Sequence, residues 1–187
     1  LAYQYHVGLD RLDADVVYQW TYTRLNPDFR LPVNELRGID ADVIFFCGLE
    51  PWAGDFLRKA HEVGLSTPII GAFSNTPEMH RRAGPAMEGS KYFDIYNVEA
   101  ATRKNQDFVK KYKVRFGINP DAWAAQAYDA LYILAKALQR TGSRNPLDLA
   151  YAIRYMDEWE GVNGSYQFDK NGNMGDKPIY LMEIRQG

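Results

Sequence analysis

The stretch that decides the fold is FVKKYKVRFGINPDAWAAQAYDALYILAKAL, residues 108–138. It predicts two helices that meet across a tight turn. Gly117 suits the left-handed conformation that often ends a helix. Asn119 can cap the second helix, and Pro120 fits its first turn, where no backbone donor is missed.

Toward the N-terminus, short apolar or aromatic runs alternate with helical segments. Continuous apolar runs of this length favour strands of a parallel sheet that is covered on both faces. The expected strands are residues 16–23, 42–48, 68–73 and 92–97, and the expected helices are residues 29–38, 51–64 and 76–83. The last helix has Thr76 as its cap and Pro77 in its first turn. This alternation predicts a βαβ series with right-handed crossovers.

Toward the C-terminus, the chain changes to helices alone, at residues 101–116, 121–140 and 146–156. The middle helix carries two apolar stripes, one of Ala124, Tyr128, Leu131, Ala135 and Leu138, the other of Ala127, Ala130, Leu134 and Ala137. A helix that is apolar over so much of its girth needs partners on two sides. The chain then returns through residues 166–168, a turn at residues 169–173 and a last strand at residues 179–184.

Composition restricts the functions open to this chain. It has 187 residues, of which 46% are hydrophobic and 25% charged, as in ordinary globular proteins. A net charge of -2 gives no basic footprint for nucleic acid, so we expect no nucleic-acid partner. Cys47 is the single cysteine, which excludes an intramolecular disulfide.

Catalysis and metal binding lack a basis in the sequence. No glycine-rich phosphate loop follows a predicted strand, and no serine has a nucleophile-elbow context. The three histidines are widely separated and show no metal-ligand spacing. We therefore expect a binding protein without a cofactor rather than an enzyme.

The strand ends supply the candidate ligand-binding residues, because ligands of an open parallel sheet bind beyond the carboxyl ends of its strands. This rule selects a set after the second, third and fourth runs: Leu49, Glu50, Phe73, Ser74, Asn75, Tyr96 and Asn97. Each has a structural alternative. Glu50 can favour the positive end of a helix dipole, Phe73 can pack in the core, and the Ser74 turn can simply begin a helix. Tyr96 suits either setting.

Four groups of short sequence motifs, in this order, resemble a known protein family. They are residues 41–71 with ADVIFFCG and FLRKAHEVGLSTPIIG, AGPAMEG at residues 83–89, the quoted 108–138 stretch, and GVNGSYQFDKNGN with PIYLMEIRQG at residues 161–187. The chain resembles the type I periplasmic solute-binding proteins, specifically their branched-chain amino-acid and amide group. The resemblance implies an α/β fold with an open, mainly parallel sheet and flanking helices.

The resemblance also implies a division of the chain between two lobes. Residues 1–97 would form the βαβ core of the C-terminal lobe, residues 98–156 would complete the N-terminal lobe, and residues 157–187 would return to the C-terminal lobe. Since family members begin with a long first lobe, we expect a missing N-terminal lobe to supply the rest of the ligand cleft and to cover the apolar middle helix.

At the candidate ligand-binding residues, this chain differs from the family members that it resembles. In the leucine/isoleucine/valine-binding members, the position of Glu50 holds a ligand-facing tyrosine, and a carboxylate near the position of Phe73 holds the ligand's ammonium group. A carboxylate has therefore moved from one loop to the next, which leaves an amino acid, an amide or an aromatic carboxylate open as the ligand.

The function that the resemblance implies is an extracytoplasmic solute receptor, periplasmic or extracellular and lipid-anchored. It would close two lobes around a small polar ligand and present it to the membrane permease of an ABC transporter. Two alternatives use the same fold: the ligand-sensing effector domain of a regulator or receptor, and a lobe for protein-protein contact without a small ligand.

Overall fold

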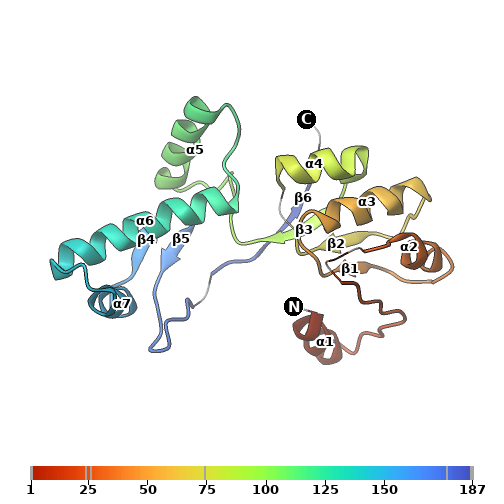
Figure 1. Ribbon diagram of the computed structural model, residues 1–187, viewed down its shortest axis with the longest axis horizontal. Coiled ribbons are helices and arrows are strands. Elements are labelled where there is room, and N and C mark those ends of the chain that lie inside the picture. Colours follow the sequence, from red (N-terminus) through yellow and green to blue (C-terminus); the bar gives the residue numbers. More distant parts are fainter. Residues whose placement is uncertain (1, 24, 26, 74, 176, 186–187) are drawn as a thin grey trace. The chain divides into compact units, whose positions relative to one another are not determined.

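A computed structural model describes residues 2–23, 25, 27–73, 75–175 and 177–185 of the chain (Figure 1). The chain divides into two compact units. The first, here the sheet unit, comprises Leu1–Phe93 and Leu181–Gly187, and the second, here the hairpin unit, comprises Asp94–Tyr180. Of the C-terminal segment, residues 181–187 belong to the sheet unit and residues 157–180 to the hairpin unit.

The sheet unit is built on a four-stranded sheet in the order β1-β2-β3-β6. Its strands are β1 (Ile44–Phe46), β2 (Ile69–Gly71), β3 (Lys91–Asp94) and β6 (Tyr180–Glu183). The first three are parallel, with Phe46 opposite Gly71 and Gly71 opposite Tyr92. Ile184 exchanges backbone hydrogen bonds with Gly89 and Ser90, which fixes the returning end of the chain beside β3.

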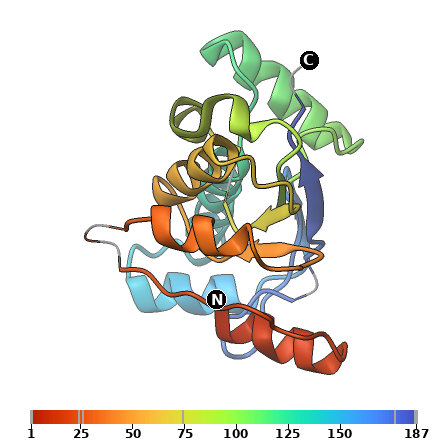
Figure 2. The ribbon, with the colours of Figure 1, turned by 90° about the vertical axis from the view of Figure 1, so that its right-hand side faces the viewer.

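Helices cover this sheet and close the core of the sheet unit. They are α1 (Ala2–Arg11), α2 (Arg30–Leu36), α3 (Trp52–Glu62), α4 (Pro77–Ala83) and the 3-10 helix η1 (Gly84–Met87). Figures 1 and 2 show α2, α3 and α4 on the same face of the sheet. The core contains stacked and edge-on aromatic rings, among them Phe29, Phe46 and Phe56.

The expected first strand is absent, because residues 16–23, all of which the structure describes, form no strand. The segment still presents alternate side chains to the core: Tyr18, Trp20 and Tyr22 pack against it, whereas Thr21 and Thr23 are exposed. Trp20 and Tyr22 stack with a centroid distance of 5.9 Å, and Tyr22 also stacks on Phe46. Aromatic packing rather than a backbone ladder therefore holds this segment beside the edge strand β1.

The hairpin unit contains three helices and a small antiparallel sheet. The helices are α5 (Arg103–Phe116), α6 (Ala122–Thr141) and α7 (Pro146–Arg154), and β4 (Trp159–Gly161) pairs with β5 (Gly164–Tyr166). The sequence did not indicate β4. Gly117 ends α5 in the predicted left-handed conformation, with φ 75°. The cap of α6 is Asp121 and not Asn119, since the Asp121 side chain accepts a hydrogen bond from the backbone N–H of Ala124 at 2.8 Å.

One face of α6 packs inside the hairpin unit, and the other remains exposed. The buried face consists of Ala122, Ala125, Asp129, Ile133 and Ala137. By contrast, Leu131 is 66% exposed, and Leu134 and Leu138 are exposed as well. This uncovered apolar face agrees with the expectation that the helix needs partners on two sides.

Candidate ligand site at the strand ends

Glu50 and Thr76 connect the carboxyl ends of two neighbouring strands in the sheet unit. Glu50 follows β1, and Thr76 follows β2 and caps α4. The Thr76 hydroxyl donates a hydrogen bond from Oγ1 to Glu50 Oε1 at 2.8 Å, and it accepts one from the backbone N–H of Met79 at 3.3 Å. The strand-end rule and the parallel register thus bring together a carboxylate and a hydroxyl that lie 26 residues apart in sequence.

The Glu50 carboxylate is half-buried and only partly satisfied. Within the described residues, its second oxygen, Oε2, makes no hydrogen bond or ion pair. The sequence had selected Glu50 for this site and Thr76 only as a helix cap. The hydroxyl that orients the carboxylate was therefore missed, and only the Thr-Pro capping signal pointed to Thr76.

Phe73 lies in the core of the sheet unit rather than on its surface, with 2% of its side chain exposed. Its ring stacks on Tyr92, with centroids 5.8 Å apart. The ring also folds back over Gly71, where an added Cβ would lie 1.9 Å from Phe73 Cε1. This packing supports a role for Phe73 in the core rather than in ligand contact.

The remaining residues of the turn after β2 are Ser74 and Asn75. Ser74 lies outside the described residues. Asn75 is exposed, and its Oδ1 lies 2.7 Å from Nε2 of His80, one turn into α4. After β1, Leu49 is 51% exposed. Asn75 and Leu49 therefore present accessible side chains near the strand ends, unlike Phe73.

Tyr96 belongs to the hairpin unit, where its hydroxyl is already engaged. The hydroxyl donates a hydrogen bond of 2.7 Å to Asn105 Oδ1, and both side chains are buried. Asn105 in turn donates to the carbonyls of Asn97, Val98 and Ala100. Burial, followed by nearby carboxylates such as Asp129, raises the pKa of Tyr96. Tyr96 thus holds the segment after β3 onto α5.

Asp129, which lies in the 108–138 stretch but was not among the predicted site residues, forms a second polar centre. The fully buried Asp129 carboxylate accepts hydrogen bonds from the backbone N–H groups of Val162 and Asn163 at 2.8 Å each, and from the Tyr166 hydroxyl at 2.9 Å. A Cβ at Gly161 would lie 2.4 Å from Asp129 Oδ2. These contacts join the AAQAYDA segment of α6 to the GVNGSY segment of the β4-β5 hairpin.

Lys177 closes the open side of this polar centre. Its ammonium group donates a hydrogen bond to the Asn163 carbonyl and lies 3.5 Å from the centroid of the Tyr166 ring. Burial lowers the pKa of Lys177 to about 8, although the Asp129 carboxylate acts in the opposite direction. Burial and the same carboxylate raise the pKa of Tyr166. The centre therefore fastens the hairpin to α6.

Neither polar centre resembles a metal site, and the part of the chain that the structure describes contains no group of three His, Cys, Asp or Glu side chains that could hold a metal ion. No helix among the described residues is long and apolar enough to span a bilayer. In the sheet unit, a cavity of about 170 Å³ lies near Thr67 and Ser90, at the amino ends of β2 and β3, and thus at the edge opposite to the candidate site.

Comparison with known proteins identifies the family. The family model described as periplasmic binding protein matches residues 4–187. The chain belongs to the periplasmic binding protein family. Members of this family are receptors and not enzymes.

Similar curated proteins include the Leu/Ile/Val-binding protein homolog 2 of Brucella abortus, 29% identical over 164 residues, which cover 86% of this chain and 43% of that protein. Another is the leucine-, isoleucine-, valine-, threonine- and alanine-binding protein of Pseudomonas aeruginosa, 25% identical over 148 residues, with 79% and 39% covered. The chain thus spans less than half the length of these relatives.

Among solved structures, the leucine binding protein LivK from Thermotoga maritima superposes with a TM-score of 0.89 at 25% identity, over 99% of this chain and 53% of that one. A solute-binding protein from R. palustris, solved in complex with benzoate, gives a TM-score of 0.85 at 21% identity, over 98% and 51%. These matches confirm the expected α/β fold with a mainly parallel sheet.

Proposed function

We propose that the chain forms part of an extracytoplasmic solute receptor. The receptor binds a small polar ligand by closure of two lobes and presents it to the membrane permease of an ABC transporter. Membership of the periplasmic binding protein family supports this function, as does the similarity to proteins named for leucine, isoleucine and valine binding. The same names favour a transport receptor over a sensory effector domain. We place the receptor in the periplasm or, lipid-anchored, at the cell surface.

The observation that carries the proposal is the Glu50 carboxylate at the end of β1. Thr76 fixes one of its oxygens, and no described residue donates a hydrogen bond to the other, Oε2. Oε2 is therefore available to a ligand. A ligand that binds beyond the carboxyl ends of parallel strands meets this oxygen first. The proposed binding residues are Glu50 with the turn of Ser74 and Asn75. Phe73 supports that edge from the core of the sheet unit, whereas Tyr96 lies in the core of the hairpin unit.

The position of the carboxylate bears on the ligand class. Glu50 stands where the resemblance implies a ligand-facing tyrosine, and no carboxylate stands at the position of Phe73. We propose that Glu50 accepts hydrogen bonds from the ammonium group of an amino acid or from the N–H groups of an amide. An aromatic carboxylate would instead be repelled by Glu50, so its binding would require cationic groups outside this turn.

Isothermal titration calorimetry of the complete receptor with amino acids, amides and aromatic carboxylates tests this proposal. For an amino-acid ligand, Glu50→Gln should weaken binding by about ten-fold or more, because a hydrogen bond to a charged group contributes roughly 1.5–3 kcal/mol. Asp42→Asn is the matched control, since Asp42 is exposed at the amino end of β1. Unchanged affinity in Glu50→Gln would show that the ligand does not bind at these loops.

The 187-residue chain alone should bind such ligands only weakly. High affinity requires burial of most of the ligand surface, and one side of a cleft offers a single face. Titration of the isolated chain against the same panel checks this expectation. A ligand that binds these residues alone with submicromolar affinity would show that the chain contains a complete site.

A further inference from the structure

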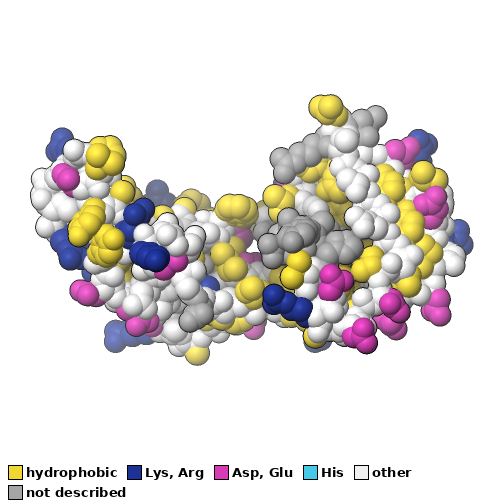
Figure 3. All heavy atoms as spheres, turned by 90° about the horizontal axis from the view of Figure 1, so that it is seen from below, with side chains coloured by type: hydrophobic (Ala, Val, Ile, Leu, Met, Phe, Trp, Pro, Cys, Tyr) yellow, Lys and Arg dark blue, Asp and Glu magenta, His cyan; other side chains and the backbone are white. Residues whose placement is uncertain are grey.

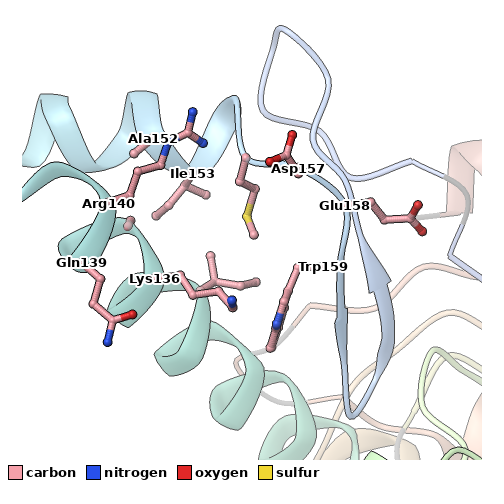
Figure 4. A pocket seen from close by; sticks show the side chains of 11 residues that line it. Lys136, Gln139, Arg140, Ala152, Ile153, Asp157, Glu158 and Trp159 are labelled. Carbon is pink, nitrogen blue, oxygen red and sulfur yellow. The ribbon is translucent and has the colours of Figure 1, made fainter.

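A cavity of about 420 Å³ lies in the hairpin unit, away from the residues of the proposed receptor site. The second half of α6, the end of α7 and the start of β4 line it (Figure 4). Its volume falls within the range of roughly 300–1,000 Å³ that is typical of pockets for small molecules. All of its lining residues belong to the hairpin unit, so its shape depends on that unit alone.

The floor of the cavity is apolar. Ile133 and Ala137 on α6 and Ala152 on α7 are buried beneath it. Met156 and Trp159 form walls that are partly exposed. Behind the cavity wall, the indole of Trp159 stacks on Tyr132, with centroids 6.4 Å apart and ring planes within 14°. This surface can take up an aliphatic or aromatic body.

The rim carries two cations on successive turns of α6, Lys136 and Arg140. Arg140 donates a hydrogen bond from Nη1 to the Tyr155 carbonyl at 3.1 Å, which fixes the guanidinium group at the edge of the cavity. Within the described residues, neither cation forms an ion pair. Both charges therefore remain available to an anion.

Two carboxylates also border the cavity, Asp157 and Glu158. In Figure 4, the Glu158 side chain points away from the cavity, and Asp157 lies across the cavity from Lys136. The Arg140 guanidinium lies beside α7, on the same side as Asp157, whereas Lys136 lies near Trp159. An anion can therefore reach Lys136 without meeting either carboxylate.

The cavity is also separate from the exposed apolar face of α6. At 3.6 residues per turn, Lys136 and Arg140 project from the side of the helix opposite to Leu134 and Leu138. On the part of Figure 3 that holds α6 and α7, apolar side chains lie beside Lys and Arg side chains. A protein segment that covers the apolar face of α6 would therefore leave the cavity open.

We propose that this cavity binds a small organic carboxylate with an apolar or aromatic body, as a site distinct from the receptor site at the strand ends. The apolar body lies against Met156 and Trp159, and the carboxylate lies at the Lys136 ammonium group. Binding here does not depend on Glu50, so this site and the proposed receptor function can fail independently.

Nuclear magnetic resonance of the purified protein tests the site through the indole N–H signal of Trp159, assigned with Trp159→Phe. Phenylacetate should shift this signal in a saturable way, and its neutral isostere phenylacetamide should bind at least about two-fold more weakly. Lys136→Gln should weaken phenylacetate binding by about two- to five-fold, the range expected for one exposed charge pair. Lys111→Gln on α5, also an exposed lysine, should leave it unchanged.

Three results would overturn the proposal. The first is equal binding of phenylacetamide and phenylacetate, and the second is an equal loss of affinity in Lys136→Gln and Lys111→Gln. The third is tighter binding of L-phenylalanine that Asp157→Asn abolishes, which would assign the cavity to zwitterions. Persistence of the phenylacetate shift in Glu50→Gln would separate this site from the one at the strand ends.

Discussion

The Thr76 hydroxyl donates a 2.8 Å hydrogen bond to Glu50 while it accepts one from the backbone of Met79. A single side chain thus caps α4 and orients the carboxylate that follows β1. Because both hydrogen bonds use the same oxygen, the start of the helix and the geometry of the candidate site depend on one residue. Stability and ligand affinity should therefore change together when Thr76 is replaced.

Thr76→Val should lower the free energy of unfolding by about 1 kcal/mol, the usual loss for a removed helix cap. It should also weaken binding of any ligand held by Glu50, because the carboxylate loses its orienting donor. Thr76→Ser keeps the hydroxyl and should retain most of both properties. Urea denaturation and calorimetry on the same samples measure the two effects, and a stability loss without an affinity loss would separate Thr76 from the site.

Asp129→Ala should be among the most destabilising single substitutions in the hairpin unit. It would leave the backbone N–H groups of Val162 and Asn163 and the Tyr166 hydroxyl without their buried acceptor. The expected loss in the free energy of unfolding is about 3 kcal/mol or more. Ala130→Ser, at the neighbouring exposed position on α6, should change stability by less than about 0.5 kcal/mol.

Stability should rise as the pH increases from about 8 toward 10, because the pKa of Lys177 falls from its ordinary 10.5 to about 8 on folding. Between these values the unfolded chain holds a proton that the folded chain has released, so raising the pH favours folding. Above pH 10 the trend should reverse, since burial raises the pKa of Tyr96 and Tyr166 in the folded state.

Lys177→Arg provides the control for this pH dependence. Arginine stays charged throughout this range, so the variant should lose the rise in stability between about pH 8 and 10 while it keeps a donor for the Asn163 carbonyl. Denaturation midpoints measured at intervals across this range compare the two proteins. An identical slope in both would mean that another group is responsible.

Phe73→Ala should act mainly on stability. The Phe73 ring is 2% exposed and stacks on Tyr92, and truncation of a buried phenylalanine typically costs about 3–5 kcal/mol. Phe116→Ala removes the same group from an exposed position and should cost far less. Thermal and urea unfolding measure the difference. Weakened ligand binding with unchanged stability would instead show that Phe73 contacts the ligand.

The strands were predictable where apolar runs were short and continuous, as in PIIG and VIFF, because burial dictates that pattern. Residues 16–23 were mistaken for a strand because a short run of apolar and aromatic side chains looks the same whether or not the backbone is paired. Ladder hydrogen bonds depend on a neighbouring backbone, and the side chains alone do not record it. The prediction of Asn119 as the cap of α6 was wrong because asparagine and aspartate have nearly equal preference for the cap position. The sequence alone could not choose between Asn119 and Asp121.

For the candidate site, the sequence could predict only which residues lie at the carboxyl edge of the sheet. Strand order places Glu50 and the turn after β2 at one edge, which is the edge of a parallel sheet where ligands are expected. The Thr76 hydrogen bond and the Asp129 centre depend on side-chain directions and on partners between 26 and 37 residues away. The buried ring of Phe73 likewise depends on Tyr92, which comes from another strand. A local pattern carries no information about such partners.

The close approach of Gly161 to Asp129 has a consequence for how this chain can vary. A side chain at residue 161 would need the volume that the Asp129 carboxylate already fills, with only 2.4 Å between the added Cβ and Oδ2. The two positions therefore share one space, and a substitution at either is conditional on the residue at the other. An alanine at position 161 should be tolerated better when residue 129 is shortened, so Gly161→Ala and Asp129→Gly should be less harmful together than the sum of their separate effects.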